Sequence, residues 1–167
     1  LGIVGRGRIG QTIARRAIGF YMDIRYHSRR PVADVEWMHE PSLVELARWA
    51  DFLVVITSGG PATRHLINAP VLKALGPRSF LINVSRGSVV DEAALVQALM
   101  EGKIAGAALD VFENEPQVPA ELLSMDNVVL LPHIASATEE TRLAMAQRVL
   151  DNFDQFLAKG QLVSEAP

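Results

Sequence analysis

The sequence predicts an α/β fold with a doubly wound parallel sheet of six strands, formed as a single domain. Short runs rich in Val, Ile, Leu and Ala alternate with longer stretches of helical periodicity, and the short runs lack strict apolar–polar alternation. A glycine-rich turn separates the first apolar run from the first helical stretch. Alternation of this kind favours parallel strands that are buried on both faces and joined by right-handed helical crossovers.

The first expected strand and helix are joined by a glycine turn. Residues 1–4 are apolar, the pattern Gly5-x-Gly7-x-x-Gly10 follows, and a helix is expected to run on to Gly19. In a turn that binds a pyrophosphate, the first glycine allows the tight bend, the second lets the backbone approach the anion, and the third lets the helix pack on the strand. Glycine turns occur in many loops, but a strand before and a helix after are the context that this motif requires. We therefore expect a Rossmann fold that binds a dinucleotide through Gly5, Gly7, Arg8, Ile9 and Gly10.

The other elements follow from apolar runs and helix signals. Further strands are expected at residues 23–27, 51–57, 79–85, 104–111 and 127–131. Helices are expected at about 42–50, 69–75 and 91–102, the last with Asp91 as its N-cap and Gly102 as its stop. The first helix is expected to bury one face, formed by Ile9, Ile13, Ala14, Ala17 and Ile18.

A long final helix is expected to begin near Thr138, with Ser136 and Glu139 as a capping box. One apolar stripe runs along it with helical spacing. The stripe has two interpretations, packing in the core or a docking face for another lobe or subunit. Its residues are Leu143, Ala146, Leu150, Phe153 and Leu157.

The composition excludes several classes of function. The 167 residues carry a net charge of −3 and no cysteine. This charge leaves no basic footprint for nucleic acid, and the lack of cysteine excludes disulfides, thiolate chemistry and cysteine–zinc sites. No apolar run reaches the ~18 residues of a membrane span, and no signal peptide is visible. We expect a cytoplasmic protein without metal, nucleic-acid or membrane partners. Because Leu1 precedes the glycine turn so closely, we also expect these residues to be part of a longer chain.

The end of the second expected strand indicates which dinucleotide binds. NAD-binding folds place an Asp or Glu there, about 20 residues past the glycines, to hold the ribose 2′-hydroxyl. Residues 26–31 read Tyr-His-Ser-Arg-Arg-Pro and contain no carboxylate. Ser28, Arg29 and Arg30 are instead suited to bind a 2′-phosphate. We predict NADP in preference to NAD, with NAD as the alternative cofactor; the other interpretation is that the arginines belong to a solvated loop.

Three polar residues follow the last three expected strands. Arg86 follows the fourth strand, Glu115 the fifth and His133 the sixth. Because ligands bind at the carboxyl ends of strands in open α/β sheets, we expect these side chains to converge near the nicotinamide. The set suits carbonyl reduction. A protonated imidazole donates a proton to the developing oxyanion, a guanidinium polarises the same oxygen or binds a carboxylate beside it, and the carboxylate orients the imidazole.

Each of these residues also has a purely structural interpretation. Arg86 is placed to cap a helix or pair with Asp91, Glu115 to be an exposed loop acid, and His133, after Pro132, to be a buried turn residue. The other histidines have no comparable setting. We interpret them as surface or loop residues, with the first near the adenosine: His27, His39 and His65.

Four motifs together resemble the cofactor-binding domain of the D-isomer-specific 2-hydroxyacid dehydrogenases, over essentially the whole chain. They are Gly-Arg-Gly-Arg-Ile-Gly at 5–10, Asn-Val-Ser-Arg-Gly-Ser-Val-Val-Asp at 83–91, Gly-Ala-Ala-Leu-Asp-Val-Phe-Glu-Asn-Glu-Pro at 106–116 and Pro-His-Ile-Ala-Ser-Ala-Thr at 132–138. The resemblance implies that Arg86 binds the substrate carboxylate and carbonyl, that His133 is the acid/base, and that Glu115 is its partner. It also implies a bond from Asp110 to the nicotinamide carboxamide. Cofactor contacts are further expected at Thr57 and Val84.

The arginines after the second strand resemble those of the NADP-preferring glyoxylate/hydroxypyruvate reductase branch. The resemblance implies hydride transfer between NADP(H) and a small 2-oxoacid or D-2-hydroxyacid, in a homodimer. The loop at 57–63 departs from the family's Pro-Leu-Thr-like sequence. The family's second lobe closes over the substrate, so we expect these residues alone to bind dinucleotide but turn over poorly. Two alternatives are a dinucleotide-sensing module such as a corepressor and a Rossmann enzyme that uses its nicotinamide only transiently.

Overall fold

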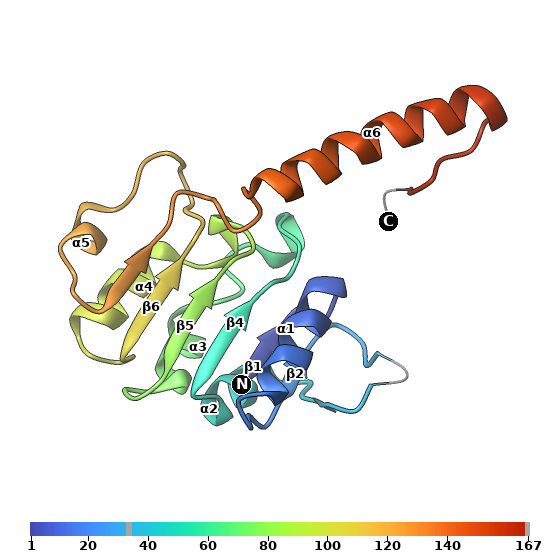
Figure 1. Ribbon diagram of the computed structural model, residues 1–167. Helices are drawn as coiled ribbons and strands as arrows, with labels where there is room; N and C mark the ends of the chain where they lie inside the picture. Colours follow the sequence, from blue (N-terminus) through green and yellow to red (C-terminus); the bar gives the residue numbers. More distant parts are fainter. Residues whose placement is uncertain (33–34, 166–167) are drawn as a thin grey trace. The chain divides into compact units, whose positions relative to one another are not determined.

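Figure 1 shows the computed structural model, which describes residues 1–32 and 35–165. The chain forms two compact units, Leu1–Pro132 and His133–Pro167. The first unit contains the whole sheet, and the second contains one long helix. That residues 1–167 form a single domain stays a prediction.

In the described part of the first unit, a parallel sheet contains seven strands in the order β3-β2-β1-β4-β5-β6-β7. The α/β class and the doubly wound parallel topology are confirmed. The predicted number of six strands is wrong, because the short edge strand formed by Met38 and His39 has no apolar run by which to recognise it. The strands are β1 (Gly2–Val4), β2 (Arg25–His27), β3 (Met38–His39), β4 (Phe52–Val55), β5 (Phe80–Asn83), β6 (Gly106–Leu109) and β7 (Val128–Leu130).

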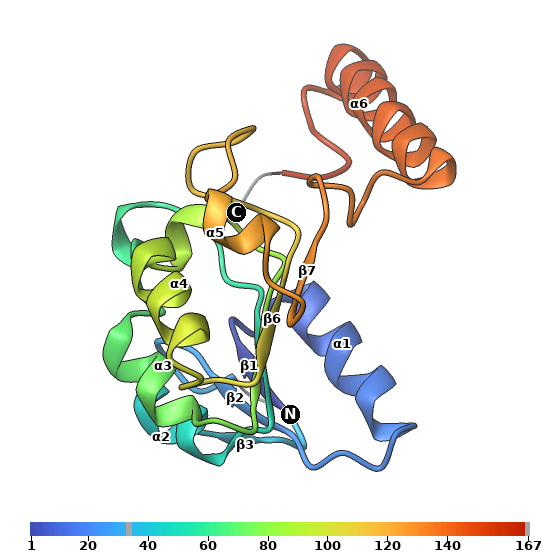
Figure 2. The same cartoon turned by 90° about the vertical axis from the view of Figure 1, so that its left-hand side faces the viewer.

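Helices cover both faces of this sheet, as Figure 2 shows: α1 lies on one face, and α2, α3 and α4 lie on the other. The direction of winding reverses at β1, whose Val4 pairs with His27 of β2 on one side and Val55 of β4 on the other. Such a reversal opens a crevice at the carboxyl ends of the two central strands. The helices are α1 (Arg8–Ile18), α2 (Leu43–Trp49), α3 (Ala69–Leu75), α4 (Glu92–Met100) and α5 (Ala120–Leu123), with 3₁₀ turns η1 (Pro61–Thr63) and η2 (Gly87–Val89).

Side-chain caps explain where these helices begin. The Asp91 carboxylate accepts a hydrogen bond from Ala94 N at 3.0 Å, as predicted, and Ser42 and Asn68 cap α2 and α3 in the same way. The α1 helix ends at Gly19 as predicted, but its buried face is narrower than expected. Ile9 and Ile18 are exposed, because the closest approach to the sheet is made by the small residues Gly10, Ala14 and Ala17.

The second unit is dominated by α6 (Glu139–Lys159). Its N-cap is Thr138, whose hydroxyl accepts a hydrogen bond from Thr141 N at 3.2 Å, so the predicted Ser136–Glu139 capping box is wrong. The predicted packing of the apolar stripe in the core is also wrong, because α6 has no buried residue within the described chain. The alternative, a docking face for another lobe or subunit, stays a prediction. The exposed members of the stripe include Leu143, Leu150, Phe153 and Leu157.

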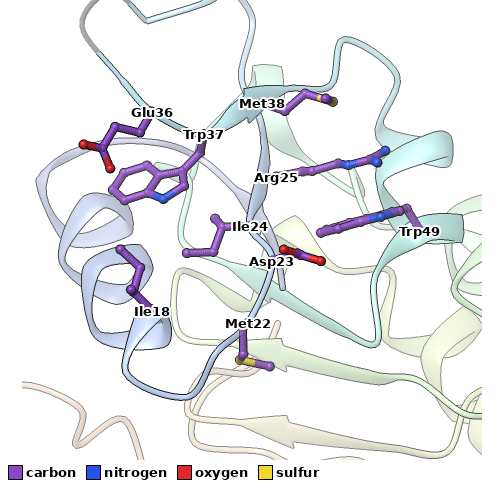
Figure 3. Close-up of a pocket in the computed structure, with 9 residues that line it drawn as sticks. All are labelled: Ile18, Met22, Asp23, Ile24, Arg25, Glu36, Trp37, Met38 and Trp49. Carbon is purple, nitrogen blue, oxygen red and sulfur yellow. The ribbon is translucent and has the colours of Figure 1, made fainter.

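A hollow of about 420 Å³ lies at the amino ends of β2 and β3, at the sheet edge opposite the crevice (Figure 3). Its wall contains Arg25, whose guanidinium stacks over Trp49 with 4.3 Å to the ring centroid. Among the described residues, no helix is long and apolar enough to cross a membrane.

Candidate dinucleotide and substrate site

The glycine turn is shaped by close backbone contacts at the crevice. Gly5 has a φ of +97°, and a Cβ added there would lie 2.5 Å from Thr57 Cα. A Cβ added at Gly10 would lie 2.5 Å from the Gly5 carbonyl oxygen. Glycine is therefore required at both positions, one to bring the turn against the end of β4 and one to bring the start of α1 against the turn.

A cavity of about 510 Å³ lies at this turn, between the ends of β1, β2 and β4. Around a Cβ added at Gly7 there is open space for 4 Å, so the backbone is accessible to a ligand there. Arg8 and Ile9 lie exposed in the first turn of α1. The structure thus brings most of the predicted nucleotide-binding positions of the first half together around one cavity, namely Gly5, Gly7, Ser28, Arg29 and Thr57.

The predicted phosphate-binding residues line an adjoining hollow. Ser28, Arg29 and Arg30 line a space of about 490 Å³, and Ser28 and Arg29 also line the cavity at the glycine turn. The Ser28 hydroxyl donates to Arg30 O at 2.6 Å, which folds the segment into a tight turn. Both guanidinium groups are exposed, so they are placed to contact an anion that enters from solvent.

Arg6 is a further candidate that the sequence reasoning missed. Its guanidinium carbon lies 5.4 Å from the Tyr26 ring centroid and 5.3 Å from that of Trp37. Its Nε and Nη1 atoms are buried and have no hydrogen-bond partner among the described residues. A buried donor without an acceptor costs about 1–3 kcal/mol. The signal in the sequence is a cation between the first two glycines of the motif.

These observations fit a phosphorylated dinucleotide. The open space at Gly7 leaves room for a pyrophosphate beside the start of α1, where backbone N–H groups face outward. The orphaned donors of Arg6 need an acceptor, and Arg6 lines the same cavity as Ser28 and Arg29. A group with several anionic oxygens meets both requirements.

The segment after β5 presents Arg86 at the carboxyl edge of the sheet. Asn83 folds this segment, because its amide donates to Arg86 O and its carbonyl oxygen accepts from Ser85 N, both at 3.1 Å. Val84 N donates to Val55 O at 3.2 Å, which ties the predicted cofactor contact to the end of β4. Arg86 is exposed, and its Nη1 donates to Ser85 O at 2.6 Å. Because this carbonyl partner is neutral, the positive charge of the Arg86 guanidinium stays available to a substrate anion.

The segment after β6 carries Asp110 and Glu115. Asp110 is buried, and its N–H donates to Asn83 O at 3.0 Å, next to the turn that presents Arg86. Glu115 is exposed, and its Oε1 accepts from Phe112 N at 3.1 Å. The structure therefore places these two predicted residues on one short segment at the carboxyl edge of the sheet.

Between them lies Glu113, which the sequence reasoning did not select. Its Oε1 accepts from Arg64 Nη2 at 2.7 Å and contacts His65 Nε2 at 3.0 Å, and its N–H donates to Glu92 Oε1 at 2.7 Å. Burial raises the pKa of the Glu92 carboxyl, and the negative charges of Glu113 and Glu115 act in the same direction.

The histidines differ in their settings. His133 is the first residue of the second unit and has a φ of +54°, which directs its backbone away from the path of a strand. His27 lines the cavity at the glycine turn, and its place near the adenosine stays a prediction. His65 lies in a loop, as predicted, and its Nε2 contacts Glu113. His39 lies in the edge strand β3, and its Nε2 contacts Ser28 O at 3.0 Å. The convergence of His133 with Arg86 and Glu115 stays a prediction.

Comparison with known proteins identifies the family. Residues 1–135 match the model of the D-isomer specific 2-hydroxyacid dehydrogenase, NAD binding domain. Glyoxylate/hydroxypyruvate reductase A of Arabidopsis thaliana is 48% identical over 164 residues, which are 98% of this chain and 52% of that protein. The 2-ketogluconate reductase of Gluconobacter oxydans is 46% identical over 164 residues, 98% of this chain and 53% of that protein.

A solved structure shows the same similarity. The NADPH-dependent glyoxylate/hydroxypyruvate reductase of Sinorhizobium meliloti, crystallised with NADP and malonate, is 52% identical with a TM-score of 0.96. The match covers 99% of this chain and 52% of that chain, so the chain spans about half the length of these relatives. Its sequence motifs, its fold and these matches show that the chain belongs to the family of NAD-binding domains of D-isomer specific 2-hydroxyacid dehydrogenases.

Proposed function

We propose that this chain is the NADP-binding domain of a reductase that converts a small 2-oxoacid into a D-2-hydroxyacid. The observation that carries the proposal is the cavity at the glycine turn. Its lining includes Ser28 and Arg29, and the end of β2 offers no carboxylate to a ribose 2′-hydroxyl. A carboxylate there would repel a 2′-phosphate, whereas a guanidinium pairs with it. The NADPH-dependent relative from S. meliloti, which is 52% identical, supports this choice of cofactor. NAD is the alternative cofactor.

In this proposal the chain's residues divide the chemistry among them. The bound dinucleotide supplies the hydride. Arg86, exposed at the end of β5, binds the substrate carboxylate and polarises the 2-oxo oxygen. His133 donates a proton to that oxygen, and Glu115 orients the imidazole and favours its protonated form. Asp110 accepts a hydrogen bond from the carboxamide of the nicotinamide.

The nucleotide end is held by the first half of the chain. The backbone around Gly7 and the start of α1 receive the pyrophosphate, and Thr57 and Val84 contact the dinucleotide from the neighbouring strand ends. Arg6 adds a donor from beneath the cavity, where its orphaned Nε and Nη1 atoms require an acceptor. We further propose that residues 1–167 act as one cofactor-binding domain of a cytoplasmic homodimer and that a second lobe closes over the substrate.

Two measurements test the proposal. The chain is titrated with NADPH and with NADH, and binding is followed by nicotinamide fluorescence. We expect NADPH to bind at least tenfold more tightly, because a charge-assisted contact to the 2′-phosphate is lost with NADH. The intact enzyme is then assayed with glyoxylate and hydroxypyruvate. Dinucleotide binding without any turnover would instead identify a sensing module, and tighter binding of NADH would refute the choice of cofactor.

A further inference from the structure

We propose that Glu113 is a positioning residue that ties the loop lining the cofactor cavity to the segment carrying Glu115. The inference rests on the proposed function, because it assigns a task to a residue beside that site. The two stretches concerned are the loop after β4, residues 56–66, and the segment after β6, residues 110–117. Among the described residues, the first lines the cavity and the second does not, so a contact between the two helps to fix the second relative to the dinucleotide.

The link is made by one carboxylate with one guanidinium and one imidazole. Glu113 Oε1 lies 2.7 Å from Arg64 Nη2 and 3.0 Å from His65 Nε2. The exposed fraction of the side chain is 19% for Glu113 and 35% for His65, against 60% for Arg64. The contact with His65 is therefore more sheltered from solvent than the contact with Arg64.

Both partners are held in place by their own backbones. His65 has a φ of +48°, and its N–H donates to Ser88 O at 2.8 Å, which aims the side chain across to the β6 segment. Glu113 N donates to Glu92 Oε1 at 2.7 Å at the start of α4. The link therefore joins two segments that each have a fixed anchor, so that it transmits position and does not merely bridge two mobile side chains.

The same segment carries Glu115 and packs against the turn that carries Arg86. A Cβ added at Gly87, next to Arg86, would lie 1.9 Å from Phe112 C, so the two backbones are in direct contact there. Phe112 N in turn holds Glu115 Oε1 at 3.1 Å. A shift of the Phe112–Glu113 peptide would thus be felt by both Arg86 and Glu115, and the contacts of Glu113 with the loop after β4 resist it.

The test measures NADPH binding to the chain and to variants of one carboxylate. Glu113→Ala removes the link, and Glu113→Gln keeps an acceptor of the same shape without the charge. The matched control is Glu101→Ala, which removes an exposed Glu paired with Lys103 at the far end of α4. We expect the dissociation constant for NADPH to rise roughly three- to tenfold in Glu113→Ala and less in Glu113→Gln, with no change in the control.

A double-mutant cycle separates positioning from general destabilisation. His65→Asn removes the imidazole while keeping a residue that tolerates positive φ. Because His65 and Glu113 form one link, we expect the double variant to bind NADPH no more weakly than Glu113→Ala alone. Additive losses, or a Glu113→Ala variant that binds like the parent, would overturn the inference and leave the proposed function intact. A parent chain that binds no dinucleotide would overturn the proposed function and this inference with it.

Discussion

The Arg86 side chain packs directly over Gly59. A Cβ added at Gly59 would lie 2.8 Å from Arg86 Cγ and 3.2 Å from its Cβ. Gly59 belongs to the loop after β4, which departs from the family's Pro-Leu-Thr-like sequence and lines the cofactor cavity. The departure therefore has a steric consequence, because the loop leaves room for the stem of the guanidinium that is proposed to bind the substrate.

Gly59→Ala is expected to displace Arg86, because the clash falls on Cγ, near the backbone, where the side chain has little freedom to move aside. In the intact enzyme we expect KM for the 2-oxoacid to rise roughly tenfold, since a small misplacement of a binding group is costly. NADPH affinity should change less than KM does. Gly19→Ala, at a helical φ of −62° at the end of α1, is the control. An unchanged KM in Gly59→Ala would show that Arg86 has another route to the substrate.

Replacing Arg29 and Arg30 by Ala is expected to reduce the preference for NADPH. Each guanidinium contact to a phosphate contributes about 1.5–3 kcal/mol, so we expect NADPH affinity to fall by roughly tenfold or more while NADH affinity stays within about threefold. The ratio of the two dissociation constants is the measurement. Arg15→Ala with Arg16→Ala, which removes two exposed arginines of α1, controls for net charge. Equal losses for both dinucleotides would indicate a general electrostatic effect.

His133→Ala is expected to lower kcat of the intact enzyme by about 10²–10⁴-fold, the usual contribution of an acid/base group. NADPH binding should be unaffected, because no nucleotide contact is assigned to this residue. Steady-state kinetics with glyoxylate, together with a fluorescence titration, separates the two effects. A kcat close to that of the parent would remove His133 from the proton-transfer step.

Glu92→Gln is expected to stabilise the chain at neutral pH and not in acid. Burial raises the pKa of folded Glu92 above the ordinary value of 4.5, so the folded state binds more protons in the window just above 4.5. The stabilising contribution of the protonated carboxyl is complete below 4.5 and is lost as the pH rises through the raised pKa. Glutamine never ionises and keeps an acceptor for Glu113 N, so we expect Tm to rise by about 1–2 °C at pH 7 and to equal the parent's at pH 4.

Glu101→Gln provides the contrast for this measurement. Hydrogen bonds from Lys103 and Gln97 lower the pKa of Glu101, so its charged form is the favoured one in the folded chain. Its stabilising contribution is present above the ordinary pKa and lost as the pH falls, and the substitution should not raise Tm at pH 7. A Glu92→Gln effect of the same size at pH 4 and pH 7 would contradict the assignment.

The parts of the fold predicted correctly are those set by local sequence. Asp91 and Gly19 cap their helices as expected, and the five longer strands after the glycine turn lie inside the predicted ranges. The strand β3 was not predicted, because an edge strand of two residues depends on pairing with β2, and a pair of residues is too short to show a periodic sequence pattern. For α6 the helix itself was predicted, but the burial of its apolar stripe was not predicted correctly. Helical spacing predicts an apolar face but not what covers that face.

The residues of the candidate site that were predicted are likewise those with a local sequence signal. The turn glycines and the residues after β2 were found because a motif and a missing carboxylate are visible in the sequence. Arg6 and Glu113 were missed because their importance comes from partners distant in the sequence: the rings of Tyr26 and Trp37 in one case and His65 in the other. A residue whose role depends on tertiary neighbours leaves no local pattern.

The close fit of Gly5 against Thr57, and of Gly10 against Gly5, has a consequence for the rate of binding. The turn owes its shape to steric contacts between backbone atoms of the chain itself, so a nucleotide meets a preorganised receptor. Little conformational entropy is lost when the pyrophosphate docks. Association should therefore show a single diffusive phase whose observed rate rises linearly with ligand concentration and does not level off at a folding step.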